Sequence, residues 1–280
     1  MTYKMLVSDL DETLLNDDGS INPDNIKTIK QAISQGFKFV PNTGRSFKSV
    51  QALLETLGLK DQAQQYVISY NGGAIVENKG NRVIATRAMT FDLAQKIFSA
   101  GIKINSAIDV HIYTVDQLFI YNISETDQAY MAERHVPYQL VDTTDLSFLK
   151  SEAPIMKVIF EHPDQAVRDV IMTEVSDTVG AENVVATYSS NRYVEFNPKG
   201  VDKGSASLQL GELLGIQQSE IMAVGDNAND KSMIDAAGLG VAVQNAIEPI
   251  KSVAQLITKK SNNEGAIAEI LQQFVLDDHE

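Results

Sequence analysis

Short apolar runs alternate with segments of helical periodicity near both ends of the chain. The runs predict β-strands at 5–7, 37–40, 66–69, 193–196, 221–224 and 240–243. A helix is predicted to begin near Asn22, with Pro23 in its first turn, and to stop at Gly36. A second helix is expected to start from a Ser46 cap and to end at Gly58. This rhythm is typical of a doubly wound parallel sheet, so the predicted fold class is α/β.

The pattern changes in the middle of the chain, where the loops become longer and more polar. Residues 75–86 predict a hairpin that turns at 78–81. Beyond it, helices are predicted at 91–100 and 163–175, and strands at 118–121, 156–161 and 183–188. His111 and His135 lie in this block, and lone histidines of this kind indicate no role.

The middle block has roughly a hundred residues, which is the size of a domain. A chain of 280 residues also has room for two domains. We therefore expect a core made of residues 1–83 and 191–280, with an inserted α+β domain at 84–190. Its hinges are expected near Ile84 and Ser190.

Composition limits the class of protein. Hydrophobic residues make up 44% and charged residues 21%, as in ordinary soluble globular proteins. No apolar run approaches about eighteen residues and no signal-peptide pattern precedes the first strand, so a cytoplasmic protein without a membrane span is expected. With no cysteine, the chain can form neither disulfides nor thiolate metal sites.

The formal net charge of −14 bears on the partners. A nucleic acid would meet a repulsive field, so nucleic-acid binding is not expected. A small anionic ligand would need a site that concentrates basic groups and a metal ion against the global charge. The sequence carries no signal for an oligomeric state.

Four polar segments lie where open α/β sheets bind ligands. Three follow predicted strands, namely Asp9–Thr13, Thr43–Arg45 and Gly225–Asp230, and the fourth, Asp202-Lys203, opens a helix. Taken singly, each has an ordinary explanation as a turn, a helix cap or a surface lysine. The two aspartates of the first segment can point to one side if the chain stays extended there.

A calcium loop is a rival interpretation of the last segment. Asp226, Ala228 and Asp230 fall on positions one, three and five of an EF-hand loop. Ala228 offers no ligand oxygen, and neither the later glycine nor the final glutamate follows at the required spacing. The sequence therefore excludes an EF-hand.

Together the four segments supply the groups that phosphoryl transfer needs. Carboxylates can bind a hard cation such as Mg²⁺, and one carboxylate can attack phosphorus. A hydroxyl group and backbone amides can hold the phosphoryl oxygens, while a lysine neutralises their charge. The coincidence of all four at strand and helix ends is far more specific than any one of them.

On these residues the chain resembles the haloacid dehalogenase-like phosphatases, and within them the Cof-type sugar-phosphate phosphatases. The matching segments are residues 9–14, 43–45, 203–204 and 225–230, together with 71–74 and 240–246. The resemblance implies a Rossmann-like core with an inserted cap domain that closes over the phosphate site. Glu12 stands where the family usually has glycine, and Asn42 stands where it usually has a small apolar residue.

The resemblance also implies roles for individual residues. Asp9 would be the nucleophile and a Mg²⁺ ligand, and Asp11 would be the general acid and base, with its backbone carbonyl on the metal. Four further residues would hold the substrate phosphate (Thr43, Gly44, Lys203, Asn229). Asp226 would complete the metal shell, and Asp230 would support the metal, directly or through water. The implied function is a Mg²⁺-dependent phosphatase that acts on small phosphorylated metabolites through an aspartyl-phosphate.

Two alternatives remain open from the sequence. One is a phosphotransferase or mutase that uses the same nucleophile, and the other is a non-catalytic metabolite-binding protein on the same scaffold. The second is opposed by the presence of every expected catalytic group (Asp9, Asp11, Thr43, Lys203, Asp226). A response-regulator receiver also uses aspartate, threonine and lysine, but it is far shorter.

Overall fold

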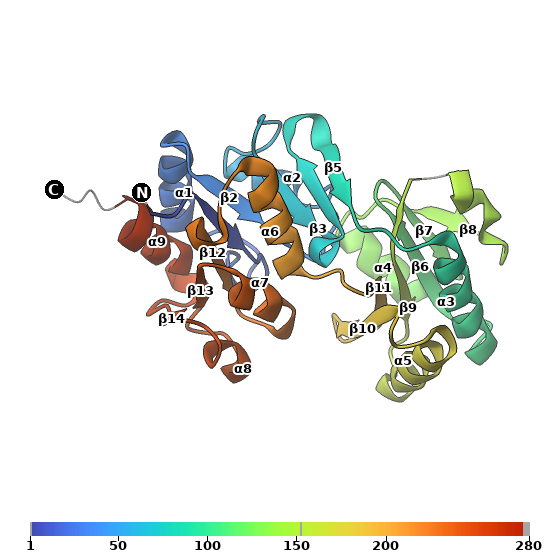
Figure 1. Ribbon diagram of the computed structural model, residues 1–280. Helices are drawn as coiled ribbons and strands as arrows, with labels where there is room; N and C mark the ends of the chain where they lie inside the picture. Colours follow the sequence, from blue (N-terminus) through green and yellow to red (C-terminus); the bar gives the residue numbers. More distant parts are fainter. Residues whose placement is uncertain (1, 152, 277–280) are drawn as a thin grey trace. The chain divides into compact units, whose positions relative to one another are not determined.

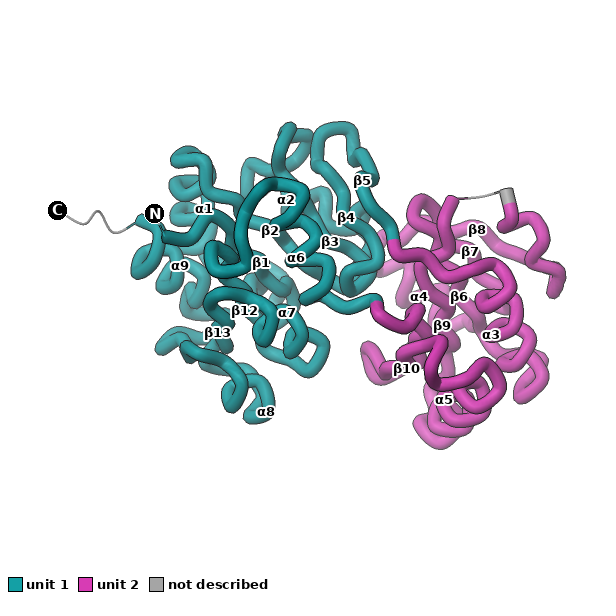
Figure 2. The backbone as a smooth tube through the Cα atoms, viewed as in Figure 1, with its two compact units in different colours: residues 1–86, 201–280 teal, residues 87–200 magenta. Residues whose placement is uncertain are grey.

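The computed structural model describes residues 2–151 and 153–276. The chain divides into two compact units, residues 1–86 with 201–280 and residues 87–200 (Figure 2). No helix in these described ranges is long and apolar enough to cross a membrane.

Unit 1 is built on a five-stranded parallel sheet with the order β14-β13-β12-β1-β2. The strands are β1 (Met5–Ser8), β2 (Lys38–Pro41), β12 (Ile221–Gly225), β13 (Leu239–Ala242) and β14 (Leu256–Ile257). The central strands β1 and β12 are buried along their whole length, as expected for a parallel sheet that helices cover on both faces. The doubly wound α/β core predicted from the sequence is confirmed.

Helices cover the sheet on both faces (Figure 1). They are α1 (Pro23–Ser34), α6 (Lys203–Leu214), α7 (Lys231–Ala236), α8 (Glu248–Lys251) and α9 (Ala266–Leu271), which continues as a π-helical turn (Gln272–Leu276). The start of α1 follows the prediction, because the Asn22 side chain accepts a hydrogen bond from the Asp24 amide at 2.9 Å and Pro23 occupies the first turn. Gly36 follows the helix with φ +87°.

The second predicted helix is wrong at its start. α2 spans Gln51–Thr56, and its cap position, Val50, makes no side-chain capping bond. Ser46 instead forms a local turn, in which its carbonyl oxygen accepts hydrogen bonds from the amide and the hydroxyl of Ser49. Residues such as serine compete with the helix by bonding to nearby backbone, and that competition delays the helix here.

The strand predicted at 66–69 exists but belongs to a different sheet. β3 (Tyr66–Ser69) forms an antiparallel sheet with β4 (Ala74–Glu77) and β5 (Arg82–Thr86). It meets β2 only through a bridge between Asn42 and Ile68, in which the Thr43 amide donates to the Ile68 carbonyl at 2.9 Å. Pro41 at the end of β2 has no N–H to extend that ladder.

Unit 2 contains a six-stranded sheet with the order β10-β11-β9-β6-β7-β8. Its strands are β6 (Asp109–Thr114), β7 (Leu118–Tyr121), β8 (Gln139–Val141), β9 (Ile155–Glu161), β10 (Val184–Ser189) and β11 (Tyr193–Pro198). The helices α3 (Phe91–Ile104) and α5 (Gln165–Val179) share a hydrophobic core with the sheet. A smaller cluster joins the sheet to α4 (Glu125–Glu133). This inserted unit is the predicted α+β domain, and β6, β8 and α4 are elements that the sequence did not predict.

The predicted return to the core at residue 191 is too early. β11 pairs with both β9 and β10, so it lies inside the sheet of unit 2 rather than in the parallel sheet. Its apolar run looked like a core strand because an interior strand of either sheet is buried on both faces. Unit 1 resumes at Val201, and unit 2 begins at Arg87 rather than at Ile84.

Candidate active site

The site of unit 1 lies where three neighbouring strands end. Asp9 follows β1, Thr43 follows β2 and Asp226 follows β12, and these strands are adjacent and parallel. The ladder continues past the strand ends, because the Asp9 amide donates to the Val224 carbonyl at 3.0 Å and the Asn42 amide donates to the Ser8 carbonyl at 2.8 Å. Parallel pairing therefore brings residues from distant parts of the sequence to one edge of the sheet.

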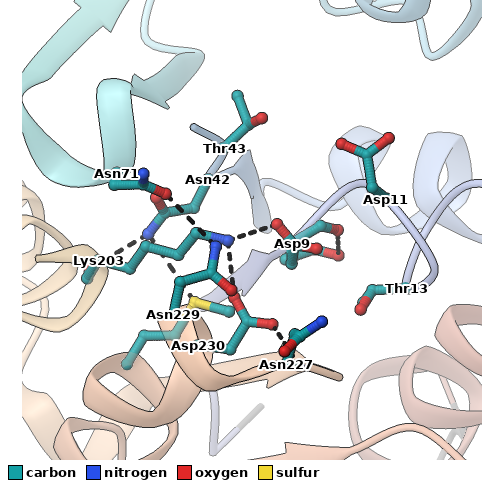
Figure 3. Close-up of polar contacts among 12 residues, drawn as sticks. Asp9, Asp11, Thr13, Asn42, Thr43, Asn71, Lys203, Asn227, Asn229 and Asp230 are labelled. Atoms are coloured by element: carbon teal, nitrogen blue, oxygen red, sulfur yellow. Dashed lines mark hydrogen bonds and ion pairs between the residues drawn. The ribbon is translucent and has the colours of Figure 1, made fainter. Parts of the chain in front are cut away.

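A buried ammonium group connects two of the carboxylates. Lys203 Nζ donates to Asp9 Oδ1, and to Asp230 Oδ1 at 2.6 Å (Figure 3). The Lys203 and Asp230 side chains are fully buried, and Asp9 is 8% exposed. Lys203 is held at the first position of α6, where the Asp202 side chain caps the helix by accepting from the Ser205 amide at 2.8 Å. Such burial is tolerated only because these charges are paired.

The third carboxylate, Asp226, is fixed by its neighbours. Its Oδ1 accepts a hydrogen bond from Thr13 Oγ1 at 2.7 Å. Asp230 Oδ2 accepts from the backbone amides of Asp226 and Asn227 at 2.9 and 3.1 Å. Gly225 permits this packing, because a Cβ atom there would lie 2.4 Å from the Cβ of Asp230.

The three carboxylates form a group that could hold a metal ion. Asp9, Asp226 and Asp230 each offer an oxygen within 4.8 Å of the others, and all three are buried. Burial raises the pKa of Asp9 to about 8, against the opposing pull of Lys203 and with help from Asp230 and Asp226. Burial likewise raises the pKa of Asp226 to about 6. A cation bound to these oxygens would relieve the surplus of negative charge.

Comparison with known proteins identifies the family. The profile of the haloacid dehalogenase-like hydrolases matches residues 6–271. The protein named "Putative phosphatase YxeH" from Bacillus subtilis (strain 168) is 31% identical over 98% of this chain and 99% of its own length. The chain is a haloacid dehalogenase-like hydrolase.

Other relatives agree in fold and reaction class. The protein named "5-amino-6-(5-phospho-D-ribitylamino)uracil phosphatase YcsE" of B. subtilis is 29% identical over 98% of this chain and 96% of its own length. A crystal structure of a haloacid dehalogenase-like hydrolase from Bacteroides thetaiotaomicron is 26% identical, with a TM-score of 0.83 over 97% of this chain and 99% of that one. This hydrolase is therefore a phosphatase of that family.

In this hydrolase Asp11 is not beside Asp9 as an extended chain would place it. Residues 11–14 turn, with Glu12 at φ +58°, and the Asp11 side chain points away from Asp9 (Figure 3). Asp11 is 56% exposed and forms an ion pair with Arg45, whose Nε donates to Asp11 Oδ2 at 3.1 Å. Arg45 is thus a site residue to which the sequence assigned no role, although it directly follows Thr43-Gly44.

The other predicted phosphate-binding residues differ in burial. Thr43 is 1% exposed, and its Oγ1 accepts a hydrogen bond from the Arg45 amide at 3.1 Å. Asn229 is exposed, and its Nδ2 donates to Asn71 Oδ1 at 3.4 Å. A Cβ atom on Gly44 would come within 3.1 Å of the Asn71 amide, so Asn71 lies close to both segments.

Two supporting residues explain how the centre is held. The Thr13 hydroxyl fixes Asp226. Asn42 is fully buried, and its Nδ2 donates to the Lys203 carbonyl at 3.1 Å and to Ser207 Oγ at 3.2 Å. The departure from a small apolar residue at position 42 thus gives β2 a direct hydrogen bond to the first turn of α6. The sequence signal for this role of Asn42 is its position as a polar residue just after the apolar run of β2.

Proposed function

We propose that this phosphatase hydrolyses small phosphorylated metabolites, sugar phosphates among them, with Mg²⁺ and through a phosphate ester on Asp9. The observation that carries the proposal is the buried Lys203 ammonium between Asp9 and Asp230, next to a third carboxylate. This arrangement supports the proposal, because the carboxylate that would act as the nucleophile lies beside a fixed positive charge. Both are needed where negative charge spreads over the transferring phosphoryl group.

In this proposal Asp9 is the nucleophile, and Asp11 donates and accepts the proton. A carboxylate oxygen of Asp9 attacks phosphorus, the bond from phosphorus to the ester oxygen breaks, and the leaving alkoxide takes a proton from Asp11. Water then attacks the phosphorus of the aspartyl-phosphate and gives a proton to Asp11, which frees phosphate and restores the Asp9 carboxylate. The ion pair between Arg45 and Asp11 must open before Asp11 can carry that proton.

The phosphoryl oxygens would be held by the residues around this pair. Lys203 supplies positive charge, Thr43 a hydroxyl, and Gly44 and Asn229 amide groups. An anion bound there would compete with Asp9 and Asp230 for the Lys203 ammonium, which has three protons to donate. The site therefore offers a local cation in a chain whose formal net charge is −14.

The donor set fits Mg²⁺, which prefers carboxylate and carbonyl oxygens together with water. Asp9, Asp226 and the backbone carbonyl of Asp11 would hold the ion, which would supply positive charge for the phosphoryl oxygens. Both oxygens of Asp230 already accept hydrogen bonds, from Lys203 and from two backbone amides. We therefore assign Asp230 to supporting the metal site rather than to direct coordination.

Unit 2 would act as the cap that selects the leaving group. The name of the relative YcsE specifies a ribityl phosphate as its substrate, which is a phosphate ester of a polyhydroxylated chain. The polar surface of a separate domain can recognise such hydroxyl groups while unit 1 binds the phosphate. A sugar phosphate is the substrate class that matches both features.

Release of phosphate tests the proposal directly. Wild-type protein with Mg²⁺ should release phosphate from an aryl phosphate and from members of a sugar-phosphate panel. Asp9→Asn should abolish release. Asp11→Asn should lower kcat by about 10²- to 10⁴-fold, because it removes only the proton transfers.

The matched control is Asp235→Asn, the same substitution at an exposed position paired with Lys231. It should leave the rate unchanged. Wild-type protein that is silent on the whole panel would overturn the assignment of these substrates. Phosphate moved to a second sugar hydroxyl instead of to water would show a phosphotransferase or mutase.

A further inference from the structure

Unit 2 contains a second buried group of metal-ligating side chains that phosphate hydrolysis does not use. Asp109 and His111 lie two residues apart on β6, so both side chains project from the same face of the sheet. Asp127 comes from α4, which covers that face. The exposed fractions of Asp109, His111 and Asp127 are 2%, 0% and 0%. Their ligand atoms all lie within 4.8 Å of one another.

One oxygen of each carboxylate is already held. Asp109 Oδ2 accepts a hydrogen bond from the Ser124 amide at 2.8 Å, and Asp127 Oδ1 accepts one from the Tyr193 hydroxyl. The other two oxygens face His111 Nε2, at 3.4 Å for Asp109 Oδ1 and 2.8 Å for Asp127 Oδ2. Outer partners that fix the ligating carboxylates in this way are characteristic of protein metal sites.

One carboxylate oxygen of the group lacks the hydrogen bond that its burial requires. Asp109 Oδ1 is buried and accepts no hydrogen bond from the described residues. Arg192 donates to Glu161 at 2.8 Å, while its Nε is 3.7 Å from Asp127 Oδ1. Two buried aspartates therefore face one imidazole, and an unpaired carboxylate oxygen in such a place is costly. A cation among the three ligand atoms would remove that cost.

We propose that Asp109, His111 and Asp127 bind a structural divalent transition-metal ion, with Zn²⁺ as the best fit. Imidazole favours zinc over Mg²⁺ or Ca²⁺, and the three protein ligands leave the fourth tetrahedral position of zinc to a water molecule. Two ligands at about 2.0–2.1 Å from a tetrahedral zinc lie about 3.3 Å apart. The separation of 3.4 Å between His111 Nε2 and Asp109 Oδ1 meets that value, and the separation of 2.8 Å between His111 Nε2 and Asp127 Oδ2 falls about half an ångström short of it. The ion joins β6 to α4.

Metal content of the full-length chain tests the proposal. The parent for this experiment is Asp226→Asn, which weakens the carboxylate group of unit 1 as a competing site. After loading with Zn²⁺ and gel filtration, the parent should retain about one zinc per chain and melt at a higher temperature than the metal-free form. Adding His111→Gln or Asp109→Asn should abolish retention, whereas His135→Gln, at an exposed histidine of the same unit, should not.

A second variant keeps the test decisive if the ligand variants fold poorly. Tyr193→Phe removes only the hydroxyl that holds Asp127, and it should weaken Zn²⁺ binding by about 10- to 100-fold in a competition titration. Cobalt substitution should give the visible absorption bands of a tetrahedral site in the parent and not in His111→Gln. A parent that retains no zinc, zinc retained by His111→Gln, or unchanged affinity in Tyr193→Phe would overturn the proposal. In those cases a proton on His111 balances the two aspartates.

Discussion

At the scale of single residues, the main feature of the site is an excess of negative charge, because three carboxylates lie around one ammonium group. Asp9 and Asp230 share Lys203, and Asp226 adds a third negative group close by. The pKa of Lys203 is raised by Asp9 and Asp230, which outweigh its burial, so the lysine stays charged. The surplus therefore has to be balanced by protons on the carboxylates or by a metal ion.

Mg²⁺ binding is accordingly expected to strengthen with pH. The pKa of Asp9 rises from 3.8 to about 8 and that of Asp226 from 3.8 to about 6 in the metal-free protein. Because both pKa values are raised in the folded protein, the protonated carboxyl groups stabilise the fold, and this stabilisation is complete below pH 3.8. The contribution of Asp226 is lost as pH rises through about 6, and that of Asp9 as pH rises through about 8. Mg²⁺ must displace those protons at low pH, so the increase in Tm with Mg²⁺ should be larger near pH 8.5 than near pH 6.

Calorimetry in buffers of different ionisation enthalpy gives the second measurement. Proton release on Mg²⁺ binding should be clear near pH 6.5 and should vanish near pH 9. In Asp226→Asn, the part of the proton release that depends on the group titrating near pH 6 should disappear. Equal Mg²⁺ affinity at both ends of this range would contradict the proposed ligands.

Glu12 carries backbone strain that a substitution can relieve. Its φ of +58° lies in the left-handed region, which costs a residue with a side chain about 1–2 kcal/mol. Glu12→Gly should relieve that strain, and after the entropy cost of glycine the free energy of unfolding should rise by about 0.5–1 kcal/mol. Chemical denaturation with Mg²⁺ absent measures the change. Glu12→Ala removes the same charge but keeps Cβ, so a gain as large in that variant would show that charge, not strain, is responsible.

At the scale of elements, the hydrogen bonds of Asn42 connect the end of β2 to the first turn of α6. Asn42→Ala should destabilise the protein by about 0.5–1.5 kcal/mol, because the buried Lys203 carbonyl loses one donor and keeps the hydrogen bond from Ser207 Oγ. It should also lower kcat, since Lys203 is then less firmly placed beside Asp9. Asn78→Ala is the matched control, because Asn78 is also buried and its Nδ2 donates to the Leu59 carbonyl at 3.0 Å.

The two variants separate stability from positioning. Both should lower the midpoint of urea unfolding by a similar amount. Only Asn42→Ala should lower kcat measured with saturating substrate and Mg²⁺ at a temperature where both variants are folded. An equal loss of kcat in Asn78→Ala would attribute the effect to general destabilisation.

At the scale of the whole molecule, the sequence predicted the residues at strand ends and missed the features that depend on turns and on polar helices. Asp9, Thr43 and Asp226 were predictable because each lies just after an apolar run. The Arg45–Asp11 pair was not, because it depends on the turn at Glu12. α4 was missed because its buried residues are Asp127 and Met131, which form no apolar stripe.

The same limit explains the boundary between the units. An apolar run such as Tyr193–Phe196 predicts a buried strand, but it does not tell which sheet the strand joins. β11 pairs with two antiparallel strands that both precede it in the sequence. Only a few residues separate it from β10, whereas more than thirty separate it from β9. Only pairing in three dimensions assigns it to unit 2.

Excision of unit 2 tests this assignment. The fragment 87–200 contains all six strands of its sheet, and its ends are near each other, since Arg87 Nη1 donates to the Gly200 carbonyl at 3.0 Å. We expect it to fold alone and to unfold cooperatively on heating. The fragment 84–190 lacks β11, which lies between β9 and β10, so its sheet is split and it should not fold. Circular dichroism and amide exchange decide between them, and a stably folded 84–190 fragment would favour the boundary predicted from the sequence.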